Sequence, residues 1–171
     1  KEPSFSIYKK ISPYLAKNYF TPPKVETSDG IATKPRILVI RTGAMGDVLL
    51  TTPIIRKLYQ DRNGFCEIHV ATRNPEIFEN SPYVLKTLTL KELRTLSESY
   101  DLILNLDMAL EKNKAAHITD AYYFYAFGSK NLSQNLQPEI FSTEQDKAKA
   151  LKFHKEFGAY MVCHNRVDPS Q

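Results

Sequence analysis

"RILVIRTGAMGDVLLTTPIIRKL", residues 36–58, joins an apolar run to a turn with two glycines and then to a helical pattern. Every residue from Ile37 to Ile40 is apolar, which is typical of a parallel strand covered on both faces. Gly43 and Gly46 follow within six residues, and Asp47 stands at the start of the helical pattern. A buried strand, a tight turn and a helix in this order predict the opening of a βαβ unit.

The same alternation continues along the rest of the chain. Further strands are expected at residues 66–72, 84–90, 100–107, 138–143 and 159–165, and helices at 47–62, 75–83, 91–99, 117–128 and 143–158. Gly128 is expected to close one of these helices, and Thr143 to cap the start of the last. Alternating strands and helices predict an α/β fold, a Rossmann-like parallel sheet flanked by helices.

The composition is that of a globular protein, with 42% hydrophobic and 25% charged residues in 171. A net charge of +4 is mildly basic and far from the dense Lys/Arg footprint of a nucleic-acid-binding protein, so no nucleic-acid partner is expected. Neither the four histidines nor the two cysteines show metal-ligand spacing, so no metal site is expected. Two cysteines form no disulfide framework, which suits a cytoplasmic location.

Three parts are expected along the chain. Residues 1–35 form an appendage and linker, residues 36–158 the Rossmann-like domain, and residues 159–171 the truncated start of an interdomain segment or a second domain. Within the appendage, residues 4–20 carry an aromatic face flanked by lysines. This face would suit peripheral contact with a membrane, at the inner face of the inner membrane, or packing against its own domain; both alternatives stay open.

The turn at residues 42–47 is expected to face a ligand, because ligands bind at the carboxyl ends of strands in open parallel sheets. Neither GK[ST] nor G-x-G-x-x-G is present, so the turn lacks both common nucleotide fingerprints. Asp47 has two interpretations, as the N-cap of the helix or as a general base. Pro53 is expected to interrupt the helix, which would restart with Thr52 as its N-cap.

The stretch "ILVIRTGAMGDVLLTTPIIRKL" resembles the opening of the ADP-heptose:lipopolysaccharide heptosyltransferase family, the ninth glycosyltransferase family. The resemblance continues in order through "EIHVATRNPEIFENSPYV", "YDLILNLD", "HITDAYYFYAFG" and "EIFSTEQDKAKALKFHKEFGAYMVCHN", and covers about residues 36–165. It implies the two-domain GT-B architecture, with the sugar acceptor held by the N-terminal domain and the nucleotide-sugar donor by the C-terminal domain. This chain corresponds to the N-terminal half only.

The resemblance implies an inverting transfer of heptose, or a related sugar, to a lipopolysaccharide or another surface-glycan acceptor. The partners would be a glycan or glycolipid acceptor and a nucleotide-sugar donor, ADP-heptose or similar, bound by the missing domain; no cofactor is implied. Asp47 maps onto the family's catalytic base. Other residues expected to contact substrate are Thr42, Gly43, Ala44, Met45, Gly46, Thr51, Asn105 and Asp107.

Asn105 and Asp107 are proposed because they form the polar end of the expected strand 100–107, on the ligand side, although polar strand ends also occur without function. Because the donor half is missing, the 171-residue chain alone is expected to be inactive. Two further classes stay open. One is a non-catalytic interaction module derived from this fold, and the other is an unrelated nucleotide-binding α/β domain.

Overall fold

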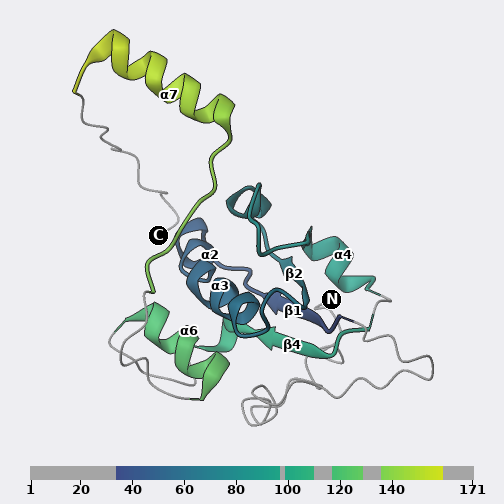
Figure 1. The fold of residues 1–171 in the computed structure, drawn as a ribbon. Helices are drawn as coiled ribbons and strands as arrows, with labels where there is room; N and C mark the ends of the chain where they lie inside the picture. The colour runs from purple at the N-terminus through teal and green to yellow at the C-terminus, as the bar shows by residue number, and fades with distance from the viewer. Residues whose placement is uncertain (1–33, 97–98, 110–116, 129–135, 160–171) are drawn as a thin grey trace. The chain divides into compact units, whose positions relative to one another are not determined.

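The computed structural model describes residues 34–96, 99–109, 117–128 and 136–159. They fall into two units, one ending at Ile140 and the other beginning at Phe141. The first unit is built on a four-stranded sheet of β1 (Arg36–Ile40), β2 (Glu67–Ala71), β3 (Lys86–Leu88) and β4 (Leu102–Asn105). The strand order is β3-β2-β1-β4 and all neighbours are parallel (Figure 1). The predicted Rossmann-like α/β fold is therefore confirmed.

The register of the sheet brings three strand ends to one edge. Ile40, the last residue of β1, pairs with Ala71 of β2 on one side and with Asn105 of β4 on the other. The amide of Arg41 donates to the carbonyl of Ala71 at 3.0 Å, which extends this pairing one residue beyond β1. The segments that follow β1 and β4 therefore emerge side by side.

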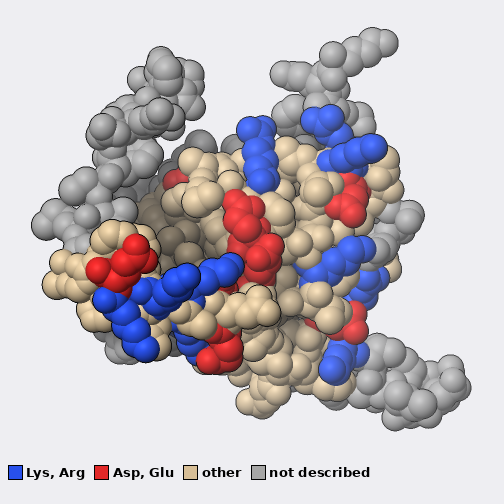
Figure 2. Space-filling view, turned by 90° about the horizontal axis from the view of Figure 1, so that it is seen from above, with Lys and Arg blue, Asp and Glu red and all other residues tan. Residues whose placement is uncertain are grey.

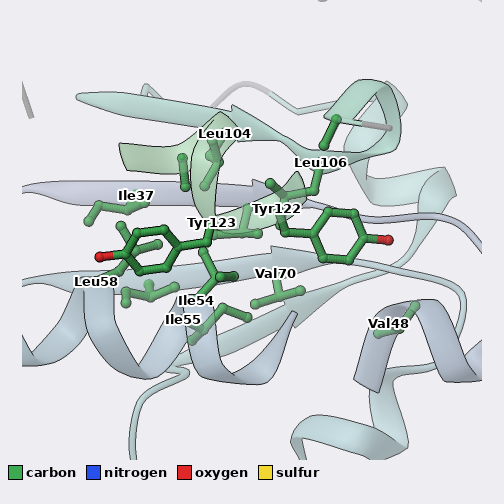
Figure 3. Packing of buried hydrophobic residues seen from close by; sticks show 14 of the residues in the cluster. Ile37, Val48, Ile54, Ile55, Leu58, Val70, Leu104, Leu106, Tyr122 and Tyr123 are labelled. Atoms are coloured by element: carbon green, nitrogen blue, oxygen red, sulfur yellow. The ribbon is translucent and has the colours of Figure 1, made fainter. Parts of the chain in front are cut away.

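Helices cover both faces of the sheet. One face packs against α3 (Thr52–Gln60) and α6 (Ile118–Phe127), and Figure 3 shows Tyr122 and Tyr123 of α6 lying in this layer with Ile54 and Leu58 of α3. The opposite face packs against Leu93 of α4 (Leu90–Arg94). Alternate residues of β1 serve the two layers, with Ile37 and Val39 in one and Leu38 and Ile40 in the other. This alternation explains why the whole strand is apolar.

The helix after β1 is interrupted as predicted, but its caps differ from the prediction. It consists of α2 (Met45–Leu49) and α3, with Ala44 as the N-cap of α2 and Thr51 as the N-cap of α3. Asp47 therefore lies in the first turn of α2 and is not its N-cap, and Thr52 is the first residue of α3 rather than its cap. The cap interpretation of Asp47 is wrong because helical hydrogen bonding begins earlier, with the amide of Val48 donating to the carbonyl of Ala44.

Threonine hydroxyls compensate for the proline at the junction of α2 and α3. Pro53 has no amide hydrogen to donate to the carbonyl of Leu49, four residues earlier. The hydroxyl of Thr52 donates to that carbonyl instead, at 2.9 Å, and the hydroxyl of Thr51 donates to the carbonyl of Val48 at 2.7 Å. The junction is therefore hydrogen-bonded, and Pro53 sits in the first turn of α3 where its missing donor costs little.

The segment 138–143 is not a strand, contrary to the prediction. Its first part is held against α3 by side chains: the amide of Glu139 donates to the Thr52 hydroxyl at 3.0 Å, and the Glu139 carboxylate pairs with Arg56 at 2.9 Å. These contacts take the place of a strand ladder, which explains why apolar residues here do not extend the sheet.

The remaining described elements form where the sequence predicts them, but several are shorter than predicted. The strand expected at 100–107 ends at Asn105, and the helix expected at 91–99 ends at Arg94. Residues 75–78 form a 3₁₀ helix, η2 (Pro75–Phe78), and a second one, η3 (Leu106–Met108), follows β4. Gly128 ends α6 with φ of 69°, and α7 (Glu144–Phe157) begins with a capping box between Thr143 and Asp146. The aromatic face in residues 4–20 and nearly all of the expected strand at 159–165 lie outside the described residues.

The surface carries charges of both signs. On the face shown in Figure 2, Lys and Arg side chains are interspersed with Asp and Glu side chains. None of the residues of α7 is buried, so its lysines are exposed. Within the described ranges, no helix combines the length and the apolar character that crossing a bilayer requires.

Candidate functional site

The candidate site lies where the chain reverses the direction in which it builds the sheet. The chain runs outward from β1 to β2 and β3, and then returns to place β4 on the other side of β1. In open α/β sheets this reversal leaves a crevice at the carboxyl ends of the two strands, where ligands bind. Here those ends are followed by Arg41 and Thr42 on the β1 side and by Leu106 and Asp107 on the β4 side.

Arg41 bridges two carboxylates at the edge of the sheet where β1 and β4 end. Its Nη2 donates to Oδ2 of Asp47 at 2.7 Å, and its Nη1 donates to Oδ1 of Asp107 at 2.9 Å. The Arg41 side chain is 11% exposed, whereas those of Asp47 and Asp107 are 35% and 21% exposed. The guanidinium is thus enclosed, and Asp47 is the most open of the three groups.

Asp107 also holds the start of the turn after β1. Its Oδ1 accepts the amide of Thr42 at 2.7 Å, and its Oδ2 accepts the hydroxyl of Thr42 at 2.8 Å. The amide of Asp107 itself donates to the side-chain oxygen of Asn105 at 3.0 Å, and Asn105 is buried. The Asn105 side chain therefore stabilises the turn at the end of β4, and the Asp107 side chain links that turn to the end of β1.

Tyr122 of α6 lies beneath the cation. The Cζ of Arg41 is 5.6 Å from the centroid of the Tyr122 ring, a cation–π distance. Burial raises the pKa of Tyr122 to about 12, with Asp47 and Asp107 adding to the rise, so this phenol is neutral. Burial alone would lower the pKa of Arg41, but Tyr122 and the carboxylates of Asp107 and Asp47 outweigh it and the pKa is raised. The guanidinium therefore stays charged.

The two glycines of the turn differ in what surrounds them. A Cβ on Gly43 would lie 2.7 Å from both Arg41 Nη2 and Asp47 Oδ2, whereas a Cβ on Gly46 would meet nothing within 4 Å. Neither glycine has a positive φ. Gly43 is therefore required for space, because the Arg41–Asp47 pair lies against its α-carbon. The side-chain Nδ2 of Asn74 donates to the carbonyl of Gly43 at 3.3 Å and supports the turn from the β2 side.

The outer lip of the turn is open to solvent. Ala44, Met45 and Gly46 are exposed, and the Met45 side chain is 55% exposed. Thr51, by contrast, is buried, and its hydroxyl donates to the carbonyl of Val48. Of the residues predicted to contact substrate, Thr42, Gly43 and Asp107 lie together with Asp47. Ala44, Met45 and Gly46 are accessible to solvent. Asn105 and Thr51 are buried, and their side chains form hydrogen bonds within the chain. Contact of any of them with substrate stays a prediction.

Comparison with known proteins gives a likeness at the level of the fold. No protein-family model matches the sequence, and no curated protein matches it. Among solved structures, the chain is similar to the crystal structure of the glycosyl transferase family 9 protein from Veillonella parvula DSM 2008, with a TM-score of 0.55. The two share 15% sequence identity over 75% of this chain and 51% of that one. At this identity the likeness shows the fold, and the chain spans about half the length of the solved structure.

Sequence reasoning missed Arg41 and Tyr122 as parts of the site. Arg41 had a signal, since it is a cation placed directly after a buried strand and six residues before the acid of the turn. Tyr122 had none, because it lies within the aromatic run of α6, of which Tyr123 and Phe127 are also buried. The part of the chain that the structure describes gathers no three His, Cys, Asp or Glu side chains that could hold a metal ion.

Proposed function

We propose that the chain is the acceptor-side half of an inverting glycosyltransferase and that Asp47 is its general base. One observation carries the proposal: the Asp47 carboxylate lies at the edge of the sheet where β1 and β4 end, held through one oxygen by Arg41 and 35% exposed. A base needs an accessible oxygen within hydrogen-bond reach of the hydroxyl it deprotonates. The fold likeness to a family 9 glycosyltransferase structure supports this function, as does the resemblance of residues 36–58 to heptosyltransferases.

The proposed reaction is a single displacement. The acceptor hydroxyl gives its proton to Asp47 as its oxygen forms a bond to the anomeric carbon of the donor sugar. The bond from that carbon to the nucleoside diphosphate breaks at the same time, and the diphosphate leaves with the electron pair. Attack opposite the leaving group inverts the anomeric centre. We propose ADP-heptose or a related nucleotide-sugar as donor, held by a second domain, and a lipopolysaccharide or other surface-glycan precursor as acceptor.

The test is Asp47→Asn in a protein that carries both halves, assayed for nucleoside diphosphate release and for the mass of the glycan product. Asn cannot accept a proton from a hydroxyl at neutral pH, so turnover should fall by ~10²-fold or more. Asp61→Asn is the matched control, because it removes the same charge from an ion pair away from the candidate site. Asp61 pairs with Lys57 of α3 at 2.7 Å. The 171-residue chain alone should show no transfer. Near-normal turnover by Asp47→Asn would remove the assigned role.

A non-catalytic interaction module is the second candidate, and α7 favours it. Leu151, Phe153 and Phe157 of this helix are each about half exposed, at 54%, 46% and 55%, and the two phenylalanine rings lie 4.5 Å apart. The assay above separates the candidates, since a module would transfer no sugar from any nucleotide-sugar, even when joined to a donor domain.

A further inference from the structure

Arg41 directly follows β1, and the surrounding residues enclose its charged guanidinium. Its amide continues the β1–β2 ladder, so its backbone is fixed by the sheet. Its guanidinium lies over the Tyr122 ring and is 11% exposed. Both of its terminal nitrogens are used, one by Asp107 and one by Asp47. A side chain held at so many points has little freedom to reorient.

The bonds of Asp107 explain what it does in this arrangement. Three donors converge on its carboxylate: the amide and the hydroxyl of Thr42, and the guanidinium of Arg41. These bonds direct both oxygens toward the chain itself. A residue presented to an acceptor sugar would need an oxygen free for the sugar hydroxyls. Asp107 is therefore better suited to hold Arg41 than to bind substrate.

We propose that Asp107 and Arg41 are positioning residues, with Asp107 fixing Arg41 and Arg41 fixing the Asp47 carboxylate. With Oδ2 held by Arg41, the other oxygen of Asp47 is presented to the acceptor hydroxyl. A fork with two donor nitrogens is needed to reach both carboxylates at once, which lysine cannot supply. The inference rests on the proposed function, since it assigns roles around the proposed base.

The kinetic test uses Asp107→Asn and Arg41→Lys in the protein that carries both halves. Misplacing a catalytic group lowers the rate of the chemical step, so kcat should fall by about 10- to 100-fold with the acceptor KM unchanged. Asp101→Asn is the matched control, because Asp101 also accepts a β1 amide, that of Arg36 at 2.8 Å, at the opposite end of the strand. It should leave both constants near the wild-type values. A raised acceptor KM with kcat intact in Asp107→Asn would make Asp107 a substrate ligand and overturn the proposal.

A second measurement tests the arrangement without catalysis. In the 171-residue chain, a guanidinium held by two carboxylates should give separate ¹⁵N resonances for the two terminal nitrogens of Arg41. In Asp107→Asn these resonances should broaden toward one another, because one of the two carboxylates that hold the guanidinium has been lost and its rotation becomes faster. Merged resonances in the wild-type chain would overturn the proposal. Separate resonances together with no sugar transfer by the unmodified two-domain protein would instead show that the proposed function is wrong.

Discussion

Replacing Gly43 by alanine should loosen the Arg41–Asp47 pair without unfolding the turn. The new Cβ would lie 2.7 Å from Arg41 Nη2 and Asp47 Oδ2 and 2.8 Å from Arg41 Cζ. All three atoms belong to the ends of side chains, so the backbone can stay in place while the pair moves apart. The same substitution at Gly46 meets open space. The two variants each add one methyl group, Gly43→Ala before α2 and Gly46→Ala within its first turn, and differ in whether that group displaces the ion pair.

The magnitude follows from the exposure of the two partners. A hydrogen bond between charged groups is worth about 1.5–3 kcal/mol when enclosed and an exposed ion pair about 0.2–1 kcal/mol. Arg41 is 11% exposed and Asp47 is 35% exposed, which places the pair between these limits, at about 1–2 kcal/mol. Either substitution also restricts the unfolded chain and gains about 0.4–1 kcal/mol. Gly46 lies in α2, where alanine also has the better helix propensity, so the gain there is the larger. Gly43→Ala should therefore be less stable than Gly46→Ala by at least about 1–2 kcal/mol.

Thermal unfolding of the 171-residue chain, followed by circular dichroism, measures this difference. For a chain of this size, a change of 1–2 kcal/mol corresponds to about 2–8 °C in Tm. In an Arg41→Met background the difference in stability between the two alanine variants should shrink by about 1–2 kcal/mol, because the pair has already been lost. Equal Tm values in the wild-type background, or a difference that does not shrink in Arg41→Met, would refute the idea that Gly43 makes room for the pair.

Two further predictions concern the junction between α2 and α3 and the start of α7. Thr52→Val removes a hydroxyl that donates to Leu49 and accepts from Glu139, and should lower the free energy of unfolding in urea by about 1–3 kcal/mol, whereas Thr52→Ser should lose much less. At α7, the hydroxyl and amide of the N-cap threonine lower the pKa of Asp146. The cap therefore stabilises the helix fully above pH 3.8, the ordinary pKa of aspartate. This stabilisation is lost as the pH falls through the lowered pKa of Asp146. The Cα chemical shifts of α7 should move toward coil in that range in wild type but not in Asp146→Asn.

The sequence predicted the parts of the fold that depend on local pattern. The apolar run in β1, the proline-marked break in the following helix and the capping box at Thr143 are all visible within a few residues. The prediction failed where a local preference competed with a distant partner. Asp47 is a favourable N-cap by type, but the guanidinium of Arg41 takes its carboxylate and the helix begins at Met45. Residues 138–143 resemble a strand by composition, yet side chains of α3 hold their first part.

The site itself depends on a pairing that no short stretch of sequence contains. Asp107 is 66 residues from Arg41 and 65 from Thr42, and it reaches them because β4 pairs with β1 in the register that sets Asn105 opposite Ile40. An alternating pattern of strands and helices predicts a parallel sheet but leaves the order of its strands open. Had β4 been added beyond β3, both β3 and β2 would lie between Asp107 and Arg41, and the carboxylate of Asp107 could not hold the guanidinium. The strand order β3-β2-β1-β4 therefore places Asp107, after β4, next to Arg41, after β1, so that the two together hold the carboxylate of Asp47.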